Sequence, residues 1–155
     1  MSSRAAWRLE TLGYTNVSRY VAGKVDWLAN GLPSEGKHAA EPRIGSLAQR
    51  DVPTCRIDER IADVRQRVAA SGFDLCVAIN EQRVVLGDLR DEALQRSPPD
   101  ACVGEVMNPG PSTYRPDVSV EEMRQHMTQT RAERVYVADA DGRLIGLLRR
   151  EAVFA

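Results

Sequence analysis

The cysteines and histidines are the side chains best suited to nucleophilic or metal chemistry, and their spacing argues against both. Cys55, Cys76 and Cys102 are far apart and form no Cys-x-x-Cys pair. His38 and His126 are the only histidines, and neither has a partner at a spacing that a metal ion would need. We therefore expect no metal site. Cys76 lies in an apolar run and is expected in the core, whereas Cys55 is either a core residue or a pocket thiol.

The charged residues exclude several classes of partner. The chain has 21 Lys and Arg against 22 Asp and Glu, interleaved along the sequence as on a solvated mixed surface. A nucleic-acid binder usually carries a clustered basic excess. No apolar run approaches the roughly 18 residues of a membrane span, and the N-terminus has no apolar stretch like that of a signal peptide. We expect a cytoplasmic protein that binds neither nucleic acid nor membrane.

An internal repeat organises most of the chain. Residues 44–94 align without a gap on residues 103–153, at an offset of 59 residues. Identical residues include two pairs of glycines, Gly45 with Gly104 and Gly87 with Gly146, and the two arginines Arg90 and Arg149. The apolar pattern matches more widely than the identities do, which indicates two copies of one structural unit.

Each copy predicts the element order β-α-β-β-α. The helix is indicated by apolar residues three and four positions apart, which bury one face. These are Ile61, Val64 and Val68 in the first copy and Val120, Met123 and Met127 in the second. Asp58 and Ser119 are the expected helix N-caps. Two strands follow, joined in the second copy by Asp141-Gly142, which is typical of a two-residue hairpin turn.

The strand glycines and the small size of each copy predict how the copies assemble. Gly87 and Gly146 lie inside strand patterns, where a backbone or a ligand must come close. Neither copy has enough apolar surface to be stable alone, so we expect the two to pack on each other. Pro98-Pro99 marks the connection between them, because proline ends the preceding helix.

The repeat resembles the CBS domain family. The second copy carries the closer match, in residues 134–139 (RVYVAD) and 141–148 (DGRLIGLL); the first copy is looser, in residues 76–80 and 84–87. The resemblance implies an α+β fold, with tandem CBS repeats in pseudo-twofold symmetry (a Bateman module) and two clefts between them. It also implies a homodimer and an adenosine-containing regulatory ligand, such as AMP, ATP or S-adenosylmethionine, with no catalytic residue.

The resemblance places a set of candidate ligand-binding residues on strands and strand ends that border the clefts. They are Thr54, Cys55, Val77, Arg90, Thr113, Tyr114, Tyr136, Val137 and Arg149. Arg90 and Arg149 either hold an anion through forked hydrogen bonds or are simply solvated. The tyrosines either stack on a base or pack in the core, and the threonines also fit plain β propensity.

Two positions depart from the family pattern. Ligand-binding members often carry Gly-x-x-Thr/Ser-x-x-Asp after the second strand, with the Asp accepting hydrogen bonds from ribose hydroxyls. Here that Asp is replaced by Ala93 and Ala152, and the Thr/Ser by the two arginines. Glu92 and Glu151 come one residue earlier, which turns each side chain by about 100° on a helix. We expect neither glutamate to substitute for the missing Asp.

The first 36 residues resemble the final third of a rhodanese domain. The matching residues are Ala5 to Tyr14, Val17, Tyr20, Gly23-Lys24, Asp26-Trp27-Leu28 and Gly31-Leu32-Pro33. The resemblance implies a helix, a strand and a second helix. We expect a short α/β N-terminal segment that is either a relic or an arm packed on the CBS pair or on a second chain, with Trp7, Leu9, Leu12, Trp27 and Leu28 as its buried contacts. The residues before Ala5 supply no cysteine nucleophile, so we expect no sulfurtransferase activity.

These observations divide the chain and leave two functions open. We expect the rhodanese-like fragment at 1–36, a linker at 37–43, the first CBS repeat at 44–97 and the second at 98–155. One function is a sensor that binds an adenosine nucleotide or related anion in a cleft and changes shape or dimer arrangement. The other is a dimerisation scaffold with degenerate clefts. An enzyme is not expected.

Overall fold

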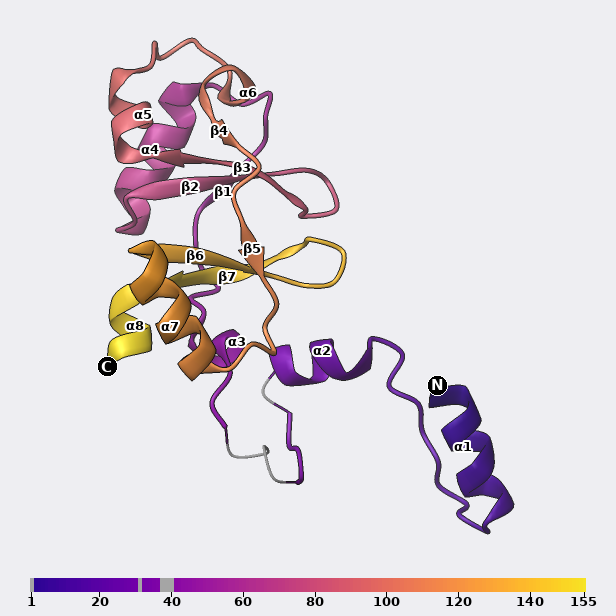
Figure 1. Ribbon diagram of the computed structural model, residues 1–155. Coiled ribbons are helices and arrows are strands. Elements are labelled where there is room, and N and C mark those ends of the chain that lie inside the picture. Colours follow the sequence, from indigo (N-terminus) through magenta and orange to yellow (C-terminus); the bar gives the residue numbers. More distant parts are fainter. Residues whose placement is uncertain (1, 31, 37–40) are drawn as a thin grey trace.

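Two β-sheet units are stacked on each other, and a helical arm extends from one side of them (Figure 1). The computed structural model describes residues 2–30, 32–36 and 41–155. Gly31 of the rhodanese-like match, and Lys37 and His38 of the expected linker, lie outside the described residues.

The first unit follows the predicted order. After the short helix α3 (Ile44–Leu47), its elements are β1 (Thr54–Cys55), α4 (Ile61–Ser71), β2 (Leu75–Ile79), β3 (Val85–Arg90) and α5 (Asp91–Arg96). β1 pairs with β2 in parallel and β2 with β3 antiparallel. The expected stripe on α4 is buried, with Ile61 and Val64 fully covered.

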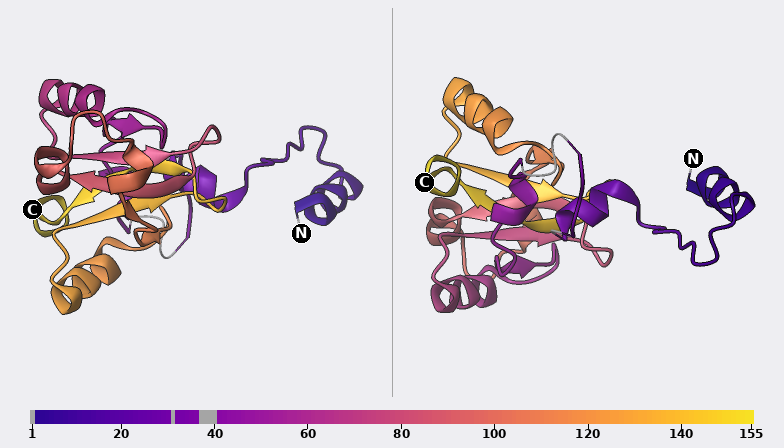
Figure 2. Two further views of the ribbon diagram at one scale, coloured as in Figure 1. Left: turned by 90° about the horizontal axis from the view of Figure 1, so that it is seen from above. Right: turned by 90° about the horizontal axis from the view of Figure 1, so that it is seen from below.

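The second unit repeats these elements. After α6 (Val103–Val106) and the short strand β4 (Asn108–Pro109), it consists of β5 (Thr113–Tyr114), α7 (Val120–Thr130), β6 (Arg134–Ala138), β7 (Leu144–Arg149) and α8 (Arg150–Phe154). The pairings β5–β6 and β6–β7 match those of the first unit. Figure 2 shows α4 and α7 on opposite sides of the stacked sheets, as pseudo-twofold symmetry requires. The predicted α+β fold with β-α-β-β-α twice is therefore confirmed.

The units exchange their leading segments. β4, which precedes the second unit, pairs with β3 of the first, with Asn108 opposite Asp88. The segment before β1 does the same in reverse, because Gln49 bridges to Leu147 on β7. A Cβ on Gly87 would meet the Met107 side chain and the Asn108 carbonyl, and one on Gly146 would meet the Gln49 carbonyl. The backbone approach predicted at both glycines is confirmed.

A third apolar cluster joins the two units. Each unit has its own core, and a separate cluster of buried residues combines both: Val52, Leu75, Val77, Ile79, Tyr136, Leu144 and Leu147. At the tips of the β2–β3 and β6–β7 hairpins, Val84 bridges to Arg143, its own counterpart in the repeat. The pseudo-twofold axis therefore passes between these two residues, and the shared core confirms that the copies pack on each other.

The two long helices start differently. Ser119 is the N-cap of α7, as predicted, and its hydroxyl accepts a hydrogen bond from the Glu122 N–H at 3.1 Å. The prediction of Asp58 for α4 is wrong: the N-cap is Arg60, without a side-chain cap. Arg60 remains extended because it forms an antiparallel bridge with Cys102, so the helix begins two residues later than Asp58 would allow.

The prediction of a two-residue turn at Asp141-Gly142 is also wrong. The Asp139 N–H donates to the Arg143 carbonyl at 3.0 Å, which closes a loop of three residues, and Gly142 has a φ of 79°. A type I turn followed by a left-handed residue suits such a loop, and glycine adopts that conformation at low cost. The matching residue of the first unit is Arg83, which has a φ of 64°.

Replacing this arginine should make the protein more stable. Left-handed backbone costs a non-glycine residue roughly 1–2 kcal/mol, part of which the greater chain entropy of glycine cancels on unfolding. We expect Arg83→Gly to raise the free energy of unfolding by up to about 1 kcal/mol, and Gly142→Arg to lower it. Urea unfolding measures both, and a less stable Arg83→Gly variant would contradict the turn assignment.

The N-terminal arm differs from the expectation. It consists of α1 (Ser2–Thr11) and α2 (Gly23–Ala29), and the described residues between them form no strand. A strand is stable only beside a partner strand, and neither sheet extends to this segment. Trp7 and Leu12 are 61% and 59% exposed, so α1 does not pack on the sheets, whereas Trp27 and Leu28 are half-buried. That a second chain covers α1 stays a prediction. Figure 2 shows α1 well apart from the sheets.

Candidate functional site

An open cleft of about 530 Å³ lies where β3 runs into α5. The leading segment of the second unit, from α6 to β4, forms its other wall. The lining residues are Asp88, Arg90, Glu92, Ala93, Arg96, Val106, Met107, Asn108 and Pro109. The cleft therefore combines an apolar wall with two guanidinium groups and two carboxylates.

A fully buried carboxylate organises the floor of this cleft. Asp88 accepts hydrogen bonds from the Asn108 amide at 3.0 Å, the Tyr136 hydroxyl at 2.6 Å and Arg90 Nε at 3.1 Å. Burial and the carboxylate of Asp88 raise the pKa of Tyr136, so its phenol remains a donor. These three partners come from β4, from β6 of the second unit and from the end of β3. Together they compensate for the burial of the charge.

Arg90 is held by one edge and open at the other. Its Nε–H points to Asp88, while its side chain is 59% exposed on the cleft. The two terminal nitrogens thus remain available, and a guanidinium in this state donates parallel hydrogen bonds to carboxylate or phosphate. Arg96 also lines the cleft, paired with Glu92 at 2.6 Å on the exposed face of α5. Such surface pairs are weak and open readily.

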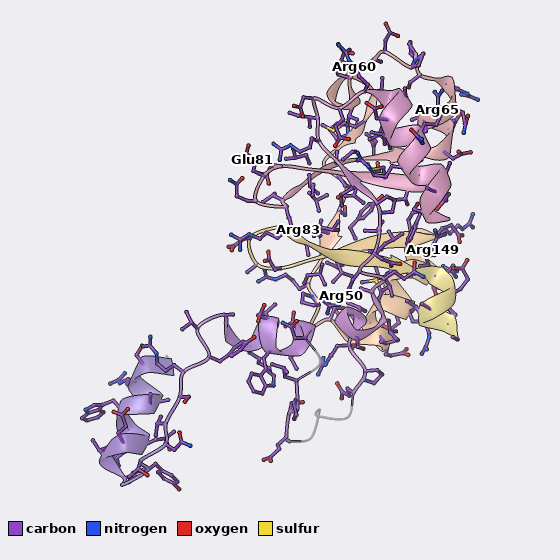
Figure 3. All side chains as sticks on the ribbon, turned by 180° about the vertical axis from the view of Figure 1, so that it is seen from behind. Arg50, Arg60, Arg65, Glu81, Arg83 and Arg149 are labelled. Carbon is purple, nitrogen blue, oxygen red and sulfur yellow. The ribbon has the colours of Figure 1, made fainter. Side chains whose placement is uncertain are left out.

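Arg149, the counterpart of Arg90, has a different environment. Its Nη2 donates to Asp74 Oδ1 at 2.9 Å, and Arg134 Nη1 donates to Asp74 Oδ2 at 2.8 Å. Its guanidinium also lies over the Phe73 ring, 5.6 Å from the centroid. Figure 3 shows Arg149 and Arg83 on opposite sides of the two stacked sheets, Arg83 on the side of the hairpin tips. The two predicted anion-binding arginines are therefore not equivalent: one is open and one is occupied.

The ion pairs of Asp74 should contribute to stability in a pH-dependent way. Partial burial opposes ionisation, but the charge of Arg134 and the hydrogen bonds from both arginines outweigh it and lower the pKa of Asp74 below that of an isolated aspartate. Because the unfolded chain binds the proton more tightly, this stability is present at pH 7 and lost as pH falls through the native pKa. At 43% side-chain exposure we expect less than about 1 kcal/mol.

The measurement is urea unfolding of the wild type and Asp74→Asn at pH 7 and at pH 3. We expect Asp74→Asn to be less stable at pH 7, and the difference to shrink at pH 3. Glu133→Gln, at the matching position of the second unit, is the control. A difference that grows towards acid would contradict the ion-pair assignment.

The other predicted site residues lie mainly in the interior. The side chains of Cys55, Val77, Tyr136 and Val137 are buried in the three core clusters. A hydrogen bond with Cys76 and burial raise the pKa of the Cys55 thiol, so it is not a reactive thiolate. Cys76 is fully buried, as expected. That a ligand contacts these four residues stays a prediction.

The remaining candidates lie on the short parallel strands. Thr54 is half-buried opposite Val77, and Thr113 is exposed opposite Tyr136. Tyr114 packs against the second core and forms a 2.5 Å hydrogen bond with His126 Nε2. Of the nine predicted residues, only Arg90 lines the described cleft. The roles of these three residues as ligand contacts stay predictions.

The ribose-anchor position lies in the cleft. Ala93 lines it, as the alignment with the family pattern predicted. Glu92 lines it too, because the cleft is wide enough to include Glu92 and Arg96, one turn apart on α5. The cleft thus retains a carboxylate acceptor despite the missing Asp. That Glu92 does not substitute for the missing Asp stays a prediction.

Several side chains of the candidate site were not identified from the sequence. Asp88 lies in an apolar strand, and this buried charge was the available signal. Asp74, Asn108 and Met107 carried no signal in the sequence, because their roles depend on contacts between units.

Elsewhere, residues of α1, α2 and the segment between them line an apolar hollow of about 440 Å³, and no acidic residue or histidine lines it.

Two general properties complete the description. Within residues 2–30, 32–36 and 41–155, no three His, Cys, Asp or Glu side chains are grouped as a metal site would require. None of the helices in that part of the chain has the length and apolar character needed to cross a membrane.

Part of the chain is similar in sequence to known proteins. Residues 103–155 match the family model described as CBS domain. The chain is 40% identical over 48 residues to a CBS domain-containing protein of Arabidopsis thaliana, CBSX2, described as chloroplastic. That match spans 31% of this chain and only a fifth of the relative's length.

Solved structures extend the likeness to both units. Crystal structures of CBSX2 with AMP and of the cytosolic domain of the Mg²⁺ channel MgtE with ATP are similar, with TM-scores of 0.63 and 0.68 and identities of 20% and 22%. Each similarity covers 73% of this chain, with 93% of the CBSX2 chain and 48% of the MgtE chain. The CBS domains of a transcriptional regulator from Streptococcus pneumoniae give 0.65 at 18% identity, over 72% of this chain and 96% of that one.

These structural matches establish the fold, and the match to the family model covers residues 103–155. The rhodanese resemblance and the domain boundaries therefore stay predictions. The findings together support a CBS module, in which residues 103–155 match the CBS domain family and the two-unit fold is that of CBS-pair proteins.

Proposed function

We propose that this protein is a regulatory CBS pair whose open cleft binds an adenosine-containing nucleotide or a related anion. The observation that carries the proposal is Arg90, which Asp88 fixes by one edge while its terminal nitrogens face an open cleft. A positioned guanidinium of this kind binds an oxyanion with little loss of side-chain entropy.

The rest of the cleft suits the remainder of such a ligand. Val106, Met107 and Pro109 offer an apolar wall for a planar base, and thioether sulfur is favourable beside aromatic rings. Glu92 and Asn108 supply polar groups for sugar hydroxyls. Two proteins of the same fold were crystallised with AMP and ATP, which supports an adenine nucleotide here.

The regulatory part of the proposal rests on the partners of Asp88. Asp88 accepts hydrogen bonds from Arg90 in the cleft, from Tyr136 in the second unit and from Asn108 on β4. A ligand that moves Arg90 would change this network, and hence the fit between the units. A ligand can shift the equilibrium between two arrangements of the units by at most the difference between its binding free energies for them.

Ligand binding should depend on Arg90. We expect AMP, ATP or S-adenosylmethionine to raise the melting temperature of the wild type, since a ligand at 100 times its Kd adds about 2.7 kcal/mol of stability. Arg90→Gln should lose most of this shift, because it removes the charged donor. Arg8→Gln, on the exposed helix α1, makes the same charge change as a control. An equal shift in the wild type and Arg90→Gln would exclude Arg90 as the anchor.

A dimerisation scaffold with degenerate clefts is the second candidate. It is favoured by Ala93 and Ala152 at the usual ribose-anchor positions and by the occupied state of Arg149. Under this function no tested nucleotide moves the melting temperature, while sedimentation velocity shows a dimer. The homodimer, the cytoplasmic location and the absence of catalysis stay predictions.

A further inference from the structure

The N-terminal arm carries most of the exposed apolar surface. Among the described residues, six of the large apolar side chains that are exposed belong to the arm and two to the stacked units. The hollow of about 440 Å³ between α1 and α2 lies in this surface, and its apolar lining includes Leu9, Val17, Tyr20, Val21 and Trp27. Its volume is that of a small-molecule pocket, and an exposed apolar patch with a polar rim usually marks a binding site.

The aromatic wall of the hollow is fixed from within the arm. The rings of Tyr20 and Trp27 meet edge to face, with centroids 5.1 Å apart. Trp27 Nε1 donates to the Pro33 carbonyl at 2.8 Å, and the Tyr20 hydroxyl donates to the Asp26 carboxylate. Both polar ends are therefore satisfied by the arm itself, and the rings offer the hollow their apolar surface.

The charges at the hollow are all positive. Arg19 and Lys24 line it, and no acidic side chain of the described residues does. Arg19 donates to the hydroxyl of Ser3, which ties the segment between the helices to α1 but leaves the positive charge without a counter-charge. Two cations beside an apolar surface complement a ligand that joins an anionic head to an apolar chain.

We propose that this hollow binds a single-chain amphiphile with an anionic head, such as a long-chain carboxylate. The apolar chain lies against Leu9 and Trp27, and the head lies beside Arg19 and Lys24. This goes beyond the proposed function, because the hollow shares no residue with the cleft at Arg90. Since α1 and α2 both contribute to the lining, a bound ligand links the two helices of the arm.

Tryptophan fluorescence is the test, because the chain has two tryptophans, Trp7 and Trp27, and of these only Trp27 lines the hollow. In the full chain carrying Trp7→Phe, dodecanoate below its micelle concentration should shift the Trp27 emission to shorter wavelength and saturate at one equivalent. In Trp27→Phe, where Trp7 reports, it should cause no saturable shift. Dodecyltrimethylammonium has the same tail with a positive head, and we expect it to bind about tenfold more weakly.

Charge variants in the Trp7→Phe background locate the head group. Lys24→Glu reverses a charge at the hollow and should weaken dodecanoate binding about tenfold. Arg8→Glu makes the same reversal on α1 outside the lining and should change the affinity little. Dodecanoate should bind more tightly than decanoate, by up to about fourfold for each further buried methylene. Circular dichroism checks the fold, and Lys24→Gln replaces Lys24→Glu if the latter loses helix.

Several results would overturn the proposal: no saturable response to dodecanoate, an equal response to both head groups, or equal affinities in the Lys24 and Arg8 variants. A Trp27 shift that occurs only with phosphatidylglycerol vesicles would also overturn it, because the arm would then bind a membrane surface instead. Adding Arg90→Gln to the Trp7→Phe background should leave dodecanoate binding unchanged, so the failure of either proposal is distinguishable from that of the other.

Discussion

Gly146→Ala should destabilise the protein by about 3 kcal/mol, the upper range for overpacking a rigid site. A Cβ at this position would lie 2.4 Å from the Gln49 carbonyl oxygen and 2.9 Å from its carbon. This backbone cannot retreat easily, because Gln49 exchanges two hydrogen bonds with Leu147, at 2.8 and 2.9 Å. The substitution therefore separates the leading segment of the first unit from β7. Urea unfolding monitored by circular dichroism gives the change.

Gly104→Ala provides the matched control. Its Cβ would come no closer than 3.3 Å to the Ile57 carbonyl, and the position lies in α6, where alanine is favoured over glycine. We expect a change within about 1 kcal/mol. If Gly146→Ala were as mild as this control, the close crossing of the two units at β7 would be wrong.

The second large effect is expected at the buried carboxylate. Tyr136→Phe removes the hydroxyl that donates to Asp88 at 2.6 Å and leaves a fully buried charge with one donor fewer. Hydrogen bonds to charged groups contribute about 1.5–3 kcal/mol, and we expect a loss of that size. Tyr114→Phe is the control, since its hydroxyl pairs with the half-buried His126 outside this network.

A double-mutant cycle tests whether the loss arises from the pair. The pseudo-twofold counterparts of Asp88 and Tyr136 are Leu147 and Val77, so an apolar pair is already tolerated at the equivalent place. Asp88→Leu alone removes the acceptor of three donors: Arg90, which is 59% exposed, can turn to water, but the Tyr136 hydroxyl and the Asn108 amide are stranded. Combined with Tyr136→Phe, it strands only the Asn108 amide. The double variant should therefore lose less stability than the sum of the single variants. Additive losses would place the cause outside the hydrogen bond.

The repeat made most of the fold predictable. An ungapped offset assigned the same elements to both halves, and the apolar stripes of α4 and α7 identified the buried face of each helix. The paired glycines indicated where two backbones cross. The exchange of β4 and the Gln49 segment was not predictable, since nothing local distinguishes pairing within a unit from pairing across units.

The site was less predictable than the fold for the same reason. Arg90 and Arg149 are identical residues at identical positions of the repeat, and sequence reasoning treated them alike. Their difference comes from Asp88 against Leu147 and from Arg134 against Leu75, which are single substitutions between the copies. Their consequences depend on which side chain of the opposite unit they meet, and that is a property of the packed pair.

In the N-terminal arm, the helices were predictable from the sequence but their burial was not. Local patterns located both of its helices, but they gave no information on whether anything covers them. Trp7, Leu12 and Tyr14 are each more than half exposed, because α1 lies beyond the reach of either sheet. Burial is decided by neighbours distant in sequence, so a fragment of an apolar pattern predicts a helix more reliably than a contact.

A crystal structure of the protein grown with saturating AMP would show whether Arg90 anchors a nucleotide. We expect phosphate density within hydrogen-bond distance of the Arg90 terminal nitrogens, with the base against Met107 and Pro109, and with the Asp74 ion pairs intact. Ordered AMP bound elsewhere, or an empty Arg90 cleft in crystals whose AMP is shown to be bound in solution, would contradict it.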